Sequence, residues 1–170
     1  MNKIISVNLP YPTYDEVKED KRMATFLREI YAGGHGELKS VLQYIYHYFY
    51  FKKLGDVQSA EVVLGIAQSE LKHVEILGDL LLKFGLDPVF ALSPWGLNCR
   101  FVSDVSYSKT AEKMIYDDIA SEMASINEYE KLLNVISDQR LKALLKRITL
   151  DEELHIKALK DRLQKVSKLF

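Results

Sequence analysis

Cysteine is nearly absent from this chain, since Cys99 is the single one among 170 residues. One cysteine cannot form an internal disulfide or a Cys-x-x-Cys metal knuckle, and such usage is typical of a reducing compartment. No apolar run approaches the roughly 20 residues that span a bilayer, and the run in residues 1–7 is too short for a signal peptide. We therefore expect a cytoplasmic protein that contacts no membrane.

The chain also lacks an excess of either charge, because it has 23 basic and 24 acidic residues. This balance gives no global field that would attract a polyanion, so we expect no nucleic-acid partner. Hydrophobic residues make up 48% of the chain. That content is enough to build the core of one compact domain, which we expect to span residues 1–170.

Glycine and proline are scarce wherever apolar residues recur at helical spacing, and they cluster between those stretches. We interpret residues 1–19 as an extended leader and residues 20–32 as a short helix. A four-helix bundle follows in residues 35–166, with helices expected near 37–53, 57–84, 110–135 and 138–165. The irregular stretch 86–109 is long enough to cross from one end of a bundle to the other. The sequence thus predicts an all-α antiparallel bundle of two helical hairpins joined by a long crossover.

Two Glu-x-x-His motifs occur in the chain, Glu70 with His73 and Glu152 with His155. Residues three apart share one face of a helix, so each motif can direct an oxygen and a nitrogen at the same point. Both faces are otherwise apolar, which places the two carboxylates toward the core. A buried ionised carboxylate is costly unless a cation or a proton accompanies it. This pattern favours metal binding.

The other two long helices each carry one glutamate on an apolar face, Glu37 and Glu122. The segments 37–44 and 122–129 match each other, and the two Glu-x-x-His segments also match, which indicates an internal repeat. All these groups lie about 15 to 18 residues from a hairpin turn, or roughly 25 Å at 1.5 Å per residue. They can therefore meet at one level of the bundle.

One Glu from each of two helices, with a Glu-x-x-His from each of the other two, is the inward-facing set that holds a metal pair in such bundles. We predict two iron or manganese ions per chain. The expected metal ligands are Glu37, Glu70, His73, Glu122, Glu152 and His155. The alternative is a metal-free bundle whose acids are half-exposed and whose histidines are satisfied by hydrogen bonds within the core.

At these residues the chain resembles the ferritin-like superfamily, over essentially all of residues 30–165. The segment Gly33-Gly34-His35-Gly36-Glu37 is similar to the rubrerythrin and manganese catalase branch. Rubrerythrins usually have an additional Glu where this chain has Ser125, and they carry a four-cysteine module that is missing here. The resemblance implies a metal pair that reacts with hydrogen peroxide or dioxygen.

We therefore expect a catalase-like or peroxidase-like oxidoreductase, and a peroxidase would also need an external electron-donor protein. Two alternatives remain, an iron-oxidising storage protein and a metal-binding bundle without turnover. The aromatic residues of the helix near 37–53 predict a subunit interface, hence a homodimer or a larger homo-oligomer.

Several residues near the predicted ligands call for separate interpretation. Tyr44 and Tyr129 are candidates for a redox role, because tyrosines often lie near the metals of the resembling family. His35 and His47 fall off the ligand face, so we expect them at the surface or at an interface. Cys99 is expected to be a packed small residue. Three basic residues should form a solvated helix face, namely Lys142, Lys146 and Arg147.

Overall fold

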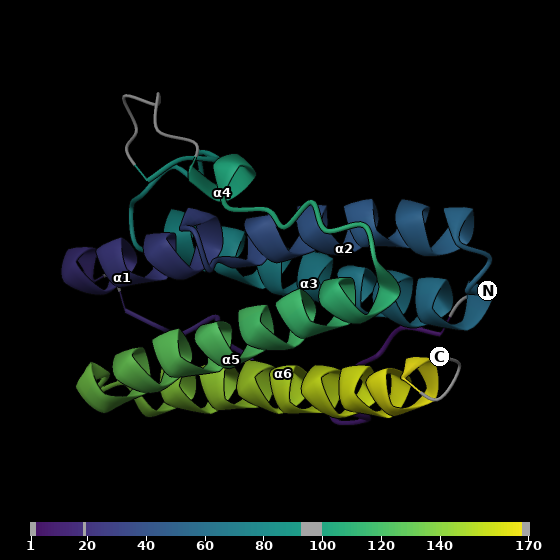
Figure 1. The fold of residues 1–170 in the computed structure, drawn as a ribbon. Coiled ribbons are helices and arrows are strands. Elements are labelled where there is room, and N and C mark those ends of the chain that lie inside the picture. The colour runs from purple at the N-terminus through teal and green to yellow at the C-terminus, as the bar shows by residue number, and fades with distance from the viewer. Residues whose placement is uncertain (1–2, 19, 93–99, 168–170) are drawn as a thin grey trace.

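A computed structural model describes residues 3–18, 20–92 and 100–167 of the chain (Figure 1). Within these ranges the protein is all-α and contains no strand. The helices are α1 (Lys21–Ala32), α2 (Glu37–Lys53), α3 (Val57–Lys83), α4 (Arg100–Ser103), α5 (Ala111–Val135) and α6 (Gln139–Val166). The all-α bundle with a short N-terminal helix is confirmed.

The helix boundaries follow from local chemistry. Asp20, Asp56 and Asp138 each precede a helix, and their side chains accept hydrogen bonds from its first free backbone N–H groups. Gly55 joins α2 to α3 with a φ of 77°, a left-handed conformation that residues with a side chain rarely adopt. The short turn at Gly55 therefore sets α2 and α3 antiparallel.

Two hairpins, α2 with α3 and α5 with α6, make up the bundle, and the chain from α4 runs beside α2 to the start of α5 (Figure 1). This crossover was expected to contain no helix, but the four-residue α4 lies within it. Cys99 lies outside the described residues. No helix in the described part of the chain is long and apolar enough to cross a membrane.

The hydrophobic core is divided into two clusters, one toward each end of the bundle. The α1-end core packs α1 against the bundle and includes Leu27, Leu77, Leu144 and Ile148. The turn-end core lies toward the α2–α3 turn and includes Phe51, Ile66, Met114 and Leu159. On α3 and α6 the Glu-x-x-His motifs fall between residues of the two clusters. The fold therefore places a polar layer between two apolar ones.

The leader lies against α3 and α6. The Ile5 backbone N–H donates to the Gly65 carbonyl on α3 at 3.1 Å. Arg147 on α6 donates to the carbonyls of Val7 and Leu9, at 2.7 and 2.9 Å for the nearest atoms. Arg147 is only 5% exposed, so its predicted place on a solvated face is wrong. The error arose because residues of an extended leader, remote in sequence, cover this part of the helix.

Candidate metal centre

The six predicted ligands come together in the polar layer. Each of the four long helices contributes one glutamate, and α3 and α6 each add a histidine. None of the six side chains is more than 1% exposed, so the alternative of half-exposed acids is wrong. Glu37 also lies in the first turn of α2, where the positive end of the helix dipole favours a carboxylate.

These side chains form two overlapping groups in which possible ligand atoms all lie within 4.8 Å of one another. The first group contains Glu37, Glu70, His73 and Glu152, and the second contains Glu70, Glu122, Glu152 and His155. Glu70 and Glu152 belong to both. The shortest contacts from histidine Nδ1 atoms are 3.1 Å from His73 to Glu152 and 3.0 Å from His155 to Glu70. The arrangement offers two adjacent four-residue cages joined by two shared carboxylates.

The interior of this cluster contains polar atoms that have no hydrogen-bond partner among the described residues. They are Glu37 Oε2, Glu70 Oε1 and Oε2, His73 Nδ1, Glu122 Oε2, Glu152 Oε1 and His155 Nδ1. Buried polar groups are almost always paired, because an unpaired one forfeits the free energy of its hydration. Carboxylate oxygens and imidazole nitrogens are the donors that iron and manganese accept. The residues present therefore fit a pair of metal ions.

The outer nitrogen of each histidine has a partner that fixes how the ring is turned. His155 Nε2 donates to the Ile5 carbonyl at 2.8 Å, and a carbonyl can only accept. His73 Nε2 donates to the Asp151 carboxylate at 3.2 Å. With the proton held at Nε2, the Nδ1 atom of each neutral ring presents its lone pair to the carboxylates, as a metal ligand must.

Two buried tyrosines cross between α2 and α5. The Tyr44 hydroxyl on α2 donates to Glu122 Oε1 on α5, and the Tyr129 hydroxyl on α5 donates to Glu37 Oε1 on α2. Burial, together with the charge of the adjacent glutamate, raises the pKa of both phenols well above the usual value, so both remain hydrogen-bond donors. Each tyrosine thus holds one oxygen of a glutamate and leaves the other facing the interior.

Protons compensate the charge of these groups when no cation does. Burial, with repulsion from Glu70 and Glu152, raises the pKa of Glu37 and that of Glu122 well above the normal range. Burial alone would also raise the pKa of Glu70, but the nearby Glu37 carboxyl and the two imidazoles favour its ionised form and hold that pKa well below the normal range. Protons therefore favour Glu37 and Glu122, while Glu70 stays ionised.

The two histidines also hold protons. Burial alone would lower the pKa of each imidazole, but the neighbouring carboxylates outweigh burial. Glu152 and Asp151 raise the pKa of His73 well above its usual value, and Glu122, Glu152 and Glu70 do the same for His155. The cluster consequently stores positive charge as protons where two cations could bind.

The groups that surround the cluster were not among the predicted ligands, and Asp151 is the most important of them. Asp151 is fully buried and accepts from His73 and, at 2.8 Å, from Arg147. Burial alone would raise its pKa, but hydrogen bonds led by those from His73 and Tyr11 hold the pKa well below its usual range. The only signal in the sequence was spacing, because Arg147, Asp151 and His155 recur every four residues and so share a helix face.

The placement predicted for His47 was also wrong. His47 is fully buried between α2 and α5, and its Nδ1 lies 2.8 Å from Asp118 Oδ1, which also accepts from Gln43. Asp118 precedes Glu122 by one helical turn. His47 and Asp118 therefore form a second polar layer beside the cluster. His35, by contrast, is exposed as expected.

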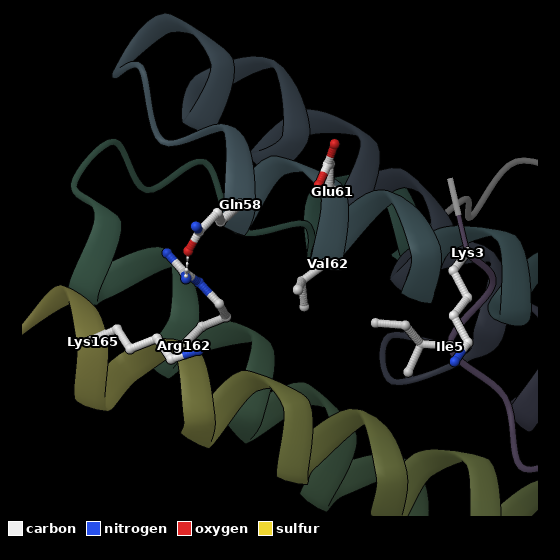
Figure 2. A pocket seen from close by; sticks show the side chains of 7 residues that line it. All are labelled: Lys3, Ile5, Gln58, Glu61, Val62, Arg162 and Lys165. Atoms are coloured by element: carbon white, nitrogen blue, oxygen red, sulfur yellow. Dashed lines mark hydrogen bonds between the residues drawn. The ribbon is translucent and has the colours of Figure 1, made fainter. Parts of the chain in front are cut away.

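A cleft of about 440 Å³ lies between α3 and α6 (Figure 2). It is lined by Lys3, Ile5, Gln58, Glu61, Val62, Arg162 and Lys165. Figure 2 shows the Ile5 side chain pointing into the cleft, while the Ile5 carbonyl accepts from His155. A single leader residue therefore lies between this cleft and a histidine of the cluster.

One protein family matches most of the chain. The family described as the ferritin-like domain matches residues 35–169, which include all six clustered side chains. The chain belongs to the ferritin-like family. A ferritin-like relative, a probable manganese catalase of Clostridium acetobutylicum, is 25% identical over 173 residues, covering 88% of this chain and 73% of that protein.

Solved structures of ferritin-like proteins show the same fold. Wild-type KatB, a manganese catalase from Anabaena, has a TM-score of 0.80 at 22% identity, with 95% of this chain and 80% of that one covered. A structure of KatB from Anabaena PCC7120 gives 0.80 at 21% identity, with 98% and 81% covered. The ferritin-like architecture of two hairpins and a crossover is thereby confirmed.

Proposed function

We propose that this protein is a two-metal enzyme that decomposes hydrogen peroxide, with Glu37, Glu70, His73, Glu122, Glu152 and His155 as the metal ligands. The observation that carries the proposal is the convergence of unpaired carboxylate and imidazole atoms in a layer excluded from water. The likeness of this chain to a probable manganese catalase and to KatB supports peroxide as the substrate and manganese as the metal.

The chain itself would hold the metal ions, orient their ligands and shield them from water. A bound pair of redox-active ions would supply the two electrons that are exchanged with each peroxide molecule. Glu70 and Glu152, which belong to both four-residue groups, would help to hold both ions, and Glu37 and Glu122 would each help to hold one. The tyrosine hydroxyls fix these two end carboxylates, and we propose this positioning role for Tyr44 and Tyr129 in place of a redox role.

Catalase activity is the form of the reaction that we favour over peroxidase activity. A catalase uses a second peroxide as the electron donor and needs no other protein, and relatives of this chain carry that name. A peroxidase would need an external electron-donor protein.

The deciding experiment is an oxygen electrode measurement on manganese-loaded protein after addition of peroxide. We expect one O₂ released for every two H₂O₂ consumed, without added reductant. Peroxide loss that requires a reductant and yields no oxygen would contradict catalase activity and indicate a peroxidase. Inertness toward peroxide, with rapid oxidation of ferrous iron and a shell-sized native mass, would instead indicate iron storage.

The tyrosine hydroxyls allow a test of whether these hydrogen bonds orient the predicted ligands. Tyr129→Phe should lower metal affinity by about 10- to 100-fold, because Glu37 then loses the donor that fixes its orientation. Tyr116→Phe is a suitable control, since Tyr116 lies on α5 and is 56% exposed. Competition with a chelator measures both affinities. Equal affinities in the two variants would show that the hydroxyl has no influence on the ligands.

A further inference from the structure

The leader contacts the outer side of both histidines in the cluster. The Ile5 carbonyl receives the Nε2 proton of His155 directly. His73 is reached through Asp151, which accepts from the Ser6 hydroxyl at 3.0 Å, the Val7 backbone N–H at 2.7 Å and the Tyr11 hydroxyl at 2.7 Å. One short extended segment therefore provides or organises the hydrogen bond at Nε2 of both imidazole rings.

Charge compensation fixes this segment in place. Arg147 pairs with Asp151 and also donates to the carbonyls of Val7 and Leu9, so the same guanidinium binds α6 and the leader. A buried guanidinium is costly unless acceptors replace the water that it has lost, and the two leader carbonyls supply part of that replacement. Displacement of the leader would thus leave buried charges on α6 without some of their partners.

Gly65 on α3 permits this close approach. A Cβ atom at position 65 would lie 2.6 Å from the Lys3 carbonyl oxygen and 3.0 Å from Ile5 Cγ1. The first distance is shorter than the contacts that Cβ atoms make in proteins, and the clashing oxygen belongs to the backbone. Any side chain at this position would therefore force the leader away from α3, although alanine is a better helix former than glycine.

We propose that residues 3–11 form a strap that positions His73 and His155 and thereby sets the rate at which the metal ions leave. This inference rests on the metal binding in the proposed function. Outer-shell partners of ligand histidines typically change metal affinity by 10- to 100-fold when removed. Lifting the strap would release the His155 ring from Ile5 and loosen Asp151 behind His73. It would also withdraw the Ile5 side chain from the cleft that it lines (Figure 2).

The test compares Gly65→Ala with Gly78→Ala, which lies on the same helix. A Cβ at Gly78 would make only ordinary contacts, the nearest at 3.8 Å to Tyr31. Both proteins are loaded with manganese, and an excess of chelator then extracts it. We expect release to be at least about 10-fold faster from Gly65→Ala, and unchanged from Gly78→Ala relative to the unaltered protein.

Two further readouts separate positioning from general loosening. In Gly65→Ala the backbone N–H groups of Ile5 and Val7 should exchange hydrogen faster, and the visible spectrum of the cobalt-loaded protein should shift as the imidazoles reorient. Tyr11→Phe, which keeps the ring and loses the bond to Asp151, should also speed release, whereas Tyr14→Phe, which loses a bond to Asp79, should not.

Equal release rates in the Gly65→Ala and Gly78→Ala proteins would overturn the strap, as would faster release from both. Tyr11→Phe keeps the question decidable if Gly65→Ala fails to fold, because an unchanged release rate there contradicts the inference equally. The proposed function fails by a different result: an unaltered protein that holds two ions but evolves no oxygen leaves the comparison of release rates intact.

Discussion

Lowering the pH by one unit should reduce the overall constant for binding both ions by up to about 10,000-fold, or about 100-fold per ion, because up to four protons must leave before two ions can enter. Glu37 and Glu122 hold two of these protons, and His73 and His155 hold the other two. Each bound proton that metal displaces contributes about one power of ten per pH unit to the apparent affinity. No single ligand would give so steep a dependence.

The effect of pH on stability has opposite signs in the metal-free and the metal-loaded protein. In the metal-free state these four groups have raised pKa values, so they stabilise the fold at low pH, and that stability is lost as the pH rises through those values. Metal binding requires the deprotonated groups, so the stability gained from metal is lost as the pH falls. We therefore expect acid to favour the metal-free bundle and alkali to favour the loaded one.

Chelator competition across a series of pH values measures this slope, and a pH-stat counts the protons released when manganese is added. About four protons per pair of ions are expected near the acid end of the binding range. A slope of one or less would mean that the cluster is already ionised without metal, and the proton assignment would then be wrong.

The sequence was sufficient for the fold class and for the convergence of the six clustered residues. Helices are rigid and periodic, so the spacing of Glu70 and His73 determines their common face, and the distance to a turn determines their height. The matching segments around Glu37 and Glu122 extended this reasoning to the other two helices. Each of these inferences needed only local geometry.

The surroundings of the cluster could not be predicted in the same way. The leader has no helical period, so nothing in its sequence indicates which helix faces Ile5 or Tyr11. Arg147 shares its face with Asp151, but its burial depends on leader residues that are some 140 positions away in the chain. His47 was misplaced for a similar reason, since its partner Asp118 lies on another hairpin.

The shared carboxylates lead to a second large effect, a difference in metal content between two glutamate variants. Glu70 belongs to both four-residue groups, whereas Glu37 belongs to one. Glu70→Ala should therefore lose both ions, and Glu37→Ala should keep the ion bound by Glu70, Glu122, Glu152 and His155. Elemental analysis of protein purified from manganese-supplemented cultures gives the content per chain.

Both variants should remain folded, because the two apolar cores on either side of the polar layer are left intact. Circular dichroism of the metal-free proteins should show the same helicity as the unaltered chain, which rules out unfolding as the cause of metal loss. Two ions retained by Glu70→Ala would exclude it as a bridging ligand. Equal loss from Glu37→Ala and Glu70→Ala would instead mean that the two ions bind only as a pair, so that an end carboxylate matters as much as a shared one.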